Sequence, residues 1–134
     1  MRDIVKIDGK QYNVLVMELS ENFNILYSQN TGRTMSTGAR MTLDPLGTFY
    51  GHTVTFGRRK GYEAEYDALF DDISRPRYDG IAVEIVHGQS TLAYDAYISN
   101  GQRAVKRIDP NTGKVYWDRM SVNIIPMEAQ VIPE

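Results

Sequence analysis

One short segment of this 134-residue chain has the periodicity of a helix, and it constrains the fold more than any other feature. In YEAEYDALFDDI, residues 62–73, apolar side chains recur three to four residues apart, which places them on one face of a helix. Pro76 follows soon after, and a proline disfavours helical angles in the residue before it. The sequence therefore predicts one substantial helix, at about 62–73.

Most of the remaining chain alternates between apolar and polar residues, which is typical of strands with one buried face. Asp8-Gly9 predicts a hairpin turn near the N-terminus, and Asn100-Gly101 predicts a tight turn within a meander over the last third of the chain. We therefore expect a mainly β (α+β) fold, an antiparallel β-sandwich or barrel of about seven to eight strands with one flanking helix. The alternating segments are NVLVMELS, NFNILYS, GHTVTFGR, GIAVEIVH, TLAYDAYIS, QRAVKRI and VYWDRMSVNII.

The length suits one β-rich domain, residues 1–134, but a long polar and glycine-dotted stretch interrupts it at about 28–47. Compact domains rarely spend more than about 12–15 residues on a loop without structure of its own. This loop contains two arginines, which are enriched at interfaces, and two methionines, which adapt to irregular surfaces. We interpret it as a docking loop rather than a flexible excursion, with four candidate interface residues: Arg33, Met35, Arg40 and Met41.

The composition of the chain argues against several classes of function. The chain has no cysteine, so it forms neither a disulfide framework nor a thiolate zinc site. A net charge of −2 argues against a dedicated nucleic-acid binder, which usually has a basic face. The apolar runs are far shorter than the roughly 20 residues of a membrane span, and the N-terminus lacks the apolar region of a signal peptide. We expect a protein made in the cytoplasm, without a membrane or nucleic-acid partner.

The expected helix has an acidic face with Asp67, Asp71 and Asp72, and like charges four residues apart destabilise a helix slightly. One interpretation is local compensation by the basic residues that flank the helix, which are Arg58, Arg59, Lys60, Arg75 and Arg77. The other interpretation is an acidic surface that contacts a basic surface on another subunit. A metal site is a weaker interpretation than a solvated face, and we expect none.

The chain has two histidines, His52 and His87, and neither predicts catalysis. His52 shares a strand face with apolar residues, which is typical of a core or interface histidine. His87, Ser90 and Asp95 could be read as a triad, but Ser90 lies in a turn without a nucleophile-elbow pattern. Phosphate-loop and calcium-loop patterns are absent as well. We expect a non-enzymatic protein with no catalytic residue, no cofactor and no small-molecule substrate.

Several motifs, in the same order along the chain, resemble those of a family of small structural proteins encoded in the tail module of long-tailed phages and prophages. The resemblance covers roughly residues 25 to 130, and its motifs are structural rather than catalytic. Phe70 stands where the family pattern has Trp, and SNGQR stands where it has a Gly-Lys-Arg run. The motifs are NTGRTMS, LDPLGTFYGHTVTF, YDALFDDISRP, LAYDAYISNGQRAV and YWDRMSVNIIPMEAQ.

The resemblance implies a virion structural role as a tail-tube, tail-completion or baseplate component. Proteins of this kind commonly use a β-sandwich or barrel with one helix, and many stack as hexameric rings in which a long loop contacts the next ring. The expected partners are then other copies of the chain and neighbouring tail proteins, and the expected location is the virion tail after synthesis in the cytoplasm of the bacterial host.

The alternative is a small β-sandwich binding module, with exposed Tyr side chains and Trp117 stacking on sugar rings. Nine Tyr and one Trp make this interpretation reasonable. The two classes differ in where the aromatic residues lie. A carbohydrate module gathers them in one groove, whereas an assembly protein disperses them through its core and its subunit contacts.

Overall fold

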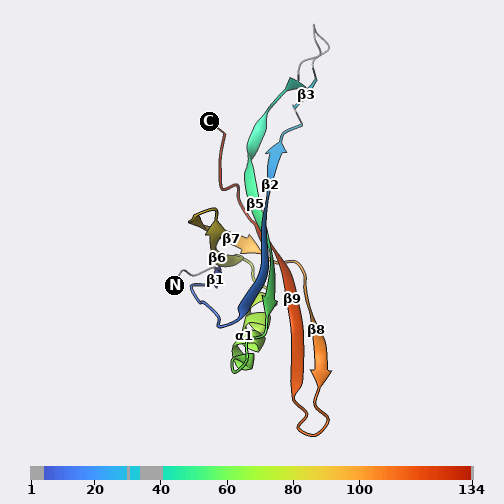
Figure 1. The fold of residues 1–134 in the computed structure, drawn as a ribbon. Helices are drawn as coiled ribbons and strands as arrows, with labels where there is room; N and C mark the ends of the chain where they lie inside the picture. The colour runs from blue at the N-terminus through green and yellow to red at the C-terminus, as the bar shows by residue number, and fades with distance from the viewer. Residues whose placement is uncertain (1–4, 30, 34–40, 134) are drawn as a thin grey trace.

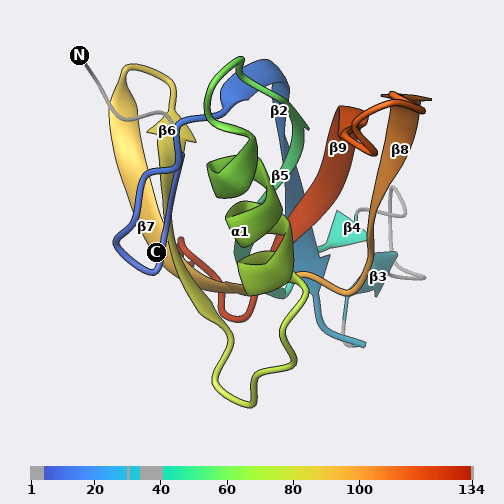
Figure 2. The same ribbon diagram turned by 90° about the horizontal axis from the view of Figure 1, so that it is seen from below.

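The computed structural model describes residues 5–29, 31–33 and 41–133, and its architecture is a bent antiparallel sheet with one helix in the bend (Figures 1 and 2). The elements in chain order are β1 (Val5–Ile7), β2 (Leu15–Tyr27), β3 (Gly32–Arg33), β4 (Met41–Thr42), β5 (Pro45–Gly57), α1 (Glu63–Ile73), β6 (Ile81–His87), β7 (Ser90–Tyr97), β8 (Gly101–Ile108) and β9 (Val115–Pro126).

The main sheet has seven strands in the order β1-β6-β7-β9-β5-β2, and β8 also pairs with β9. Strand β9 joins two wings, because Met120–Ile124 pair with β5 whereas Ile125 and Pro126 pair with β7. One wing is β1-β6-β7 and the other is β2-β5-β9-β8. The expected mainly β fold with a single helix is confirmed, and the sheet is open rather than closed into a barrel.

The core lies where the two wings and the helix meet (Figure 2). Tyr66, Leu69 and Ile73 bury one face of α1, as the apolar spacing predicts. They pack with inward side chains of both wings, and burial of each such side chain stabilises the fold by about 1.5–3 kcal/mol. The buried strand residues are Val5, Ile7, Ile81, Val83, Ile85 and Ala96 from the first wing, and Val54, Phe56, Met120, Val122 and Ile124 from the second.

Arg103 on β8 fastens the helix to the second wing. Its guanidinium lies 4.1 Å from the centre of the Phe70 ring and 4.0 Å from that of Trp117, and it pairs with Asp67 at 2.7 Å. The side chain is only 15% exposed, so these cation–π contacts are partly desolvated and stronger than on an open surface. Tyr66 adds a hydrogen bond from its hydroxyl to the backbone oxygen of Asp118, at 2.9 Å.

Strands β2 and β5 form a long hairpin that projects from the body (Figure 1). Each has thirteen residues, which corresponds to about 40 Å at roughly 3.3 Å per residue. The two strands pair from Leu15 with Gly57 to Tyr27 with Pro45. The part of β5 near Phe56 belongs to the core, whereas the part near Pro45 belongs to the projection.

The stretch expected as a loop at about 28–47 lies at the end of this hairpin, and its outer parts are regular. β5 already begins at Pro45, and Gly32 and Arg33 of β3 pair with Thr42 and Met41 of β4. Ser28 and Thr31 both hydrogen-bond to Asp44, which draws the two sides of the stretch together. These contacts replace much of the expected loop with hairpin. Polar residues can form such strands because both faces meet solvent.

Two expected turns lead to strand pairings that differ from the prediction. Asp8 and Gly9 adopt the positive φ angles of a tight turn, 53° and 78°, and Ile7 pairs with Lys10 across it, but the strand partner of β1 is β6. Asn100 and Gly101 connect β7 to β8, yet these two strands lie in different wings and do not pair. Of the expected meander, the pairs β6–β7 and β8–β9 form, but the pair β7–β8 does not, because β9 lies between those two strands.

Two phenylalanines on the β2–β5 hairpin provide a matched test of this core. Phe56 is 2% exposed and Phe23 is 67% exposed. We expect Phe56→Ala to lower the free energy of unfolding by about 3–5 kcal/mol because it leaves a cavity. Phe23→Ala should change it by less than about 0.5 kcal/mol. Urea denaturation followed by circular dichroism measures both, and equal losses would contradict this assignment of the core.

Candidate functional site: a histidine cluster and an exposed hairpin

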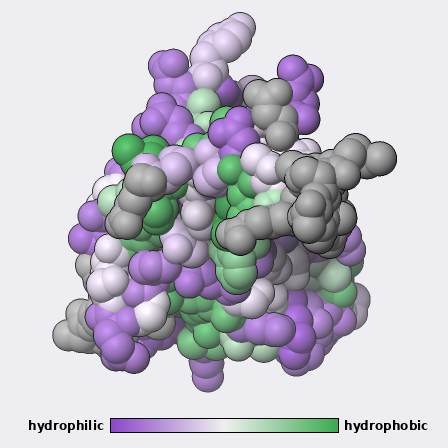
Figure 3. Space-filling view, turned by 90° about the horizontal axis from the view of Figure 1, so that it is seen from above, coloured by the Kyte–Doolittle hydropathy of each residue, from purple (hydrophilic) through white to green (hydrophobic). Residues whose placement is uncertain are grey.

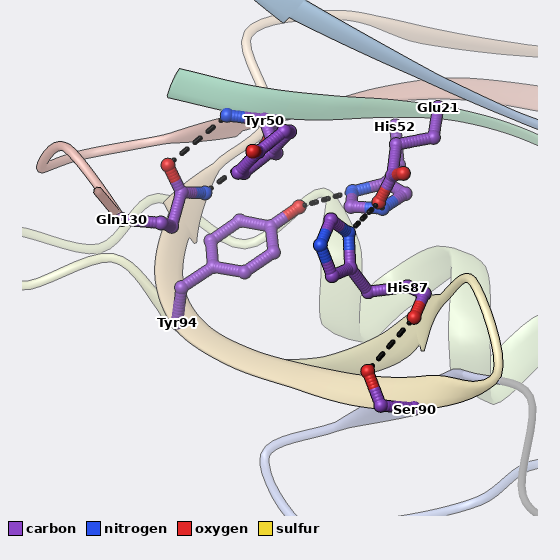
Figure 4. Close-up of polar contacts among 7 residues, drawn as sticks. All are labelled: Glu21, Tyr50, His52, His87, Ser90, Tyr94 and Gln130. Carbon is purple, nitrogen blue, oxygen red and sulfur yellow. Dashed lines mark hydrogen bonds and ion pairs between the residues drawn. The ribbon is translucent and has the colours of Figure 1, made fainter. Parts of the chain in front are cut away.

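A cluster of polar side chains joins the hairpin to the β6–β7 wing (Figure 4). Glu21 of β2 accepts from both histidines through one carboxylate oxygen, at 2.9 Å from His52 Nε2 and 2.7 Å from His87 Nδ1. The other ring nitrogen of His52 lies 2.8 Å from the Tyr94 hydroxyl. The Tyr50 ring packs against His87 with a centroid separation of 4.8 Å. Four strands, β2, β5, β6 and β7, therefore meet at this cluster.

A neutral His52 with its proton on Nε2 satisfies both of its contacts in the cluster. Tyr94 donates to His52 Nδ1, His52 Nε2 donates to Glu21, and His87 Nδ1 also donates to Glu21. The His52 side chain has no exposed surface, and this burial lowers its pKa below the usual value although the Glu21 carboxylate acts in the opposite direction. Burial also acts to raise the pKa of Glu21, but the hydrogen bonds from His87 and His52 outweigh it and the net pKa is lowered.

Tyr94, His52 and Glu21 form a hydrogen-bonded chain of the kind found in proton relays. The pKa shifts and the burial of the cluster favour a structural role instead. A side-chain nucleophile can be activated by an adjacent base or by a lowered pKa. His52 lies next to the Tyr94 hydroxyl, but burial and the charge of Glu21 raise the pKa of Tyr94 well above its usual value, which keeps that hydroxyl protonated. His52 has no exposed surface through which it could reach a substrate. We interpret the cluster as a set of structural hydrogen bonds that holds the base of the hairpin against the β1-β6-β7 wing.

The triad weighed from the sequence is not assembled. Ser90 Oγ donates to the backbone oxygen of His87 at 2.9 Å, whereas the His87 ring faces Glu21. Asp95 lies on β7 next to Tyr94, and successive residues of a strand point to opposite faces. The sequence could not reveal the actual cluster, since Glu21 lies 31 and 66 positions from its two histidine partners.

The projecting half of the hairpin is rich in exposed apolar side chains. Phe23 is 67% exposed, Leu43 is 59% exposed and Leu46 is 51% exposed. Viewed from above, hydrophobic side chains interrupt the polar surface (Figure 3). Contiguous exposed apolar surface is typical of interaction sites. Further large apolar residues exposed on the same hairpin are Ile25, Leu26, Tyr27 and Met41.

The candidate interface residues fall into two groups. In the first, Arg33 lies on β3 and Met41, which is 42% exposed, lies on the facing β4, so the described part of this group is at the hairpin end. Met35 and Arg40 lie outside the described residues. The exposure of Met41 leaves its side chain accessible, and the docking interpretation of this group stays a prediction.

The second group is the acidic face of α1, and most of its charge is compensated within the chain. Asp67 pairs with Arg103, and Asp72 accepts from the Tyr12 hydroxyl and pairs with Arg75 at 3.4 Å. The bond from Tyr12 lowers the pKa of Asp72, while burial and that same bond raise the pKa of Tyr12 to about 12. Asp71 is exposed and, among the described residues, makes no ion pair.

Aromatic residues are dispersed over the described structure rather than gathered in one groove. Trp117 is covered by Arg103, Tyr66 is in the core, and Tyr94 belongs to the histidine cluster. The most exposed tyrosines, Tyr78 and Tyr97, lie on different elements, one in the loop after α1 and the other on β7. The described aromatic residues named here therefore share no single groove, and the choice between the two classes stays a prediction.

Neither a metal-ligand cluster nor a membrane-spanning helix is found within the described ranges. Residues 5–29, 31–33 and 41–133 contain no group of three or more His, Asp or Glu side chains placed to hold a metal ion. The helix described here is too short and too polar to span a membrane.

Comparison with known proteins does not place the chain in a family. No protein-family model matches the sequence, and no curated protein matches it.

The histidine cluster predicts how stability depends on pH. His52 has a lowered pKa in the folded protein, so below about pH 6.5 the unfolded chain binds a proton that the folded chain does not. The free energy of unfolding should therefore fall between pH 7.5 and pH 5.5. His52→Gln should flatten this dependence, whereas the exposed Lys60→Gln should not. Urea denaturation at each pH measures the free energy of unfolding. An equally steep pH dependence in His52→Gln would show that His52 is not its cause.

Proposed function

We propose that this chain is a non-enzymatic structural protein that associates with copies of itself. Its proposed setting is the tail of a long-tailed phage or prophage, as a tail-tube, tail-completion or baseplate component. The observation that carries self-association is a four-stranded wing, β2-β5-β9-β8, with both edges open in the described structure.

The β2 edge has few of the features that normally prevent strand pairing. Among the described residues β2 pairs only with β5, so one side of a thirteen-residue strand is available. Natural edge strands are commonly protected by Lys, Pro, bulges or short length. β2 contains neither Lys nor Pro, and its pairing with β5 is irregular at only two points, between Val16 and Glu18 and between Leu26 and Tyr27. A strand of this length and composition favours the addition of another strand.

Direction and charge favour β8 of a second copy as that strand. Each neighbouring pair in the wing is antiparallel, so β2 and β8 run in opposite directions and can continue the antiparallel pattern. Glu21 and Arg103 are already engaged within the chain, which leaves Glu18 on β2 and Lys106 and Arg107 on β8 for a contact between charges. Opposite charges across paired strands stabilise and like charges destabilise. β2 with β8 is thus better matched than β2 with β2.

A contact between two different surfaces of one chain closes into a ring or continues as a filament. Both are forms in which tail proteins occur, and the sequence motifs that resemble the tail family support the same setting. The exposed apolar hairpin is the second candidate contact, to a further copy or to a neighbouring tail protein. Its base is held by the histidine cluster, which presents it in one orientation.

Light scattering across a concentration series tests the proposal. We expect the parent protein to form oligomers. Glu18→Lys and Lys106→Glu should each raise the concentration for half association by about 2- to 10-fold, because each places like charges across the edge. The double variant should regain part of the loss, since it exchanges the two charges.

Lys60→Glu is the matched control, because it reverses an exposed lysine in the loop before α1, which belongs to neither edge strand. It should associate as the parent does. A strictly monomeric parent at the highest concentration would contradict self-association, and unchanged association of both edge variants would contradict the β2–β8 contact.

A further inference from the structure

An apolar cavity of about 220 Å³ opens where the sheet fails to close. It lies between the edge strand β1, the start of β2 and the helix, and its floor includes the buried side chains of Ile7, Phe56 and Leu69. Gln11 lies at the rim, and Arg59 is the one charged residue of the lining. An engineered cavity of about 150 Å³ in another protein holds benzene, so this volume has room for an aliphatic side chain.

The tail after β9 presents such a side chain. Ile132 is 74% exposed, and Val131 before it is 47% exposed. The hairpin holds the tail firmly, because the Gln130 amide makes two hydrogen bonds of 3.0 Å to the Tyr50 backbone, and Val131 pairs with Thr48. Gly47 permits this close approach, since a Cβ there would lie 2.5 Å from that of Ala129. Ile132 thus follows directly on a fixed segment.

We propose that Ile132 of one copy docks in this cavity on a second copy. The occupant is apolar and small enough for the space, and the tail that carries it is ordered by its hairpin contacts. Charge agrees as well, because the described tail, residues 127–133, carries only Glu128, whereas the cavity lining carries only Arg59. Burial of the Ile132 side chain removes exposed apolar surface from water on both copies.

The contact forms between copies rather than within one chain. In Figure 1 the C-terminal end lies beside the projecting hairpin, whereas α1 and the start of β2, which border the cavity, lie at the opposite end of the body. An apolar side chain that fits a pocket elsewhere on the same molecule makes a head-to-tail contact. This contact rests on the proposed self-association. It would join copies along the direction of the hairpin, whereas the β2–β8 pairing joins them side by side.

Cross-linking tests the geometry, since the natural chain has no cysteine to interfere. We would prepare Ile132→Cys and Gln11→Cys as separate proteins and treat each alone, and their mixture, with a short bismaleimide. Only the mixture should give a cross-linked dimer, and that dimer should contain one Ile132→Cys chain and one Gln11→Cys chain. Tyr78→Cys, at a fully exposed position in the loop after α1, replaces Ile132→Cys as the control and should give none.

Association of Ile132→Ser separates this contact from the lateral one. We expect the variant to keep the smallest oligomer but to need at least about fivefold more protein for larger assemblies, and Ile132→Val should behave as the parent does. Cross-linking of Ile132→Cys with itself would overturn the proposal in favour of a tail–tail contact.

Two other outcomes distinguish the two proposals. Oligomers that form equally well in Ile132→Ser, with no cross-link to Gln11→Cys, would overturn the docking of Ile132 and leave the proposed function standing. A parent protein that stays monomeric and gives no cross-link would overturn both.

Discussion

The pairing of β2 with β5 over thirteen residues is the constraint on which the rest of the structure depends. Near Gly57 the pair forms one wall of the core, and its inward side chains meet the helix. Towards Tyr27 the same pair continues beyond the body, where both faces meet solvent and burial ends. Backbone hydrogen bonds alone hold an isolated hairpin only marginally. The tie from Glu21 to His52 and His87, and the tail along Thr48, therefore support the projection where the core cannot.

The open sheet follows from the same arrangement. Strand β1 has three residues and β2 diverges from it, so the two wings leave an unpaired edge and an apolar cavity between them. A closed barrel would have covered both. An open β2 edge, an apolar hairpin and an exposed Ile132 are surfaces that another chain can cover. The proposed assembly with further copies would account for all three.

Local patterns in the sequence predicted local structure well and predicted partners poorly. The helix at 62–73 agrees with α1 because its apolar spacing is set by residues within the segment, and His52 is buried with Val54 and Phe56 as their shared face implies. The pairing of β1 with β6 and the separation of β7 from β8 could not be predicted, because Asp8-Gly9 and Asn100-Gly101 specify turns but not which strands meet. Contacts such as Glu21 with His87 join distant residues and leave no local pattern.

Hydrogen exchange at the amides of β2 and β8, compared between dilute and concentrated samples, tests the central claim most directly. Strand addition at an edge buries the outward backbone N–H groups, which alternate along the strand. The account predicts that about half of the amides of Leu15–Tyr27 and Gly101–Ile108 exchange more slowly in the concentrated sample, while those of the interior strand β6 do not change. Unchanged exchange at both edges in a sample whose mass shows association would contradict it.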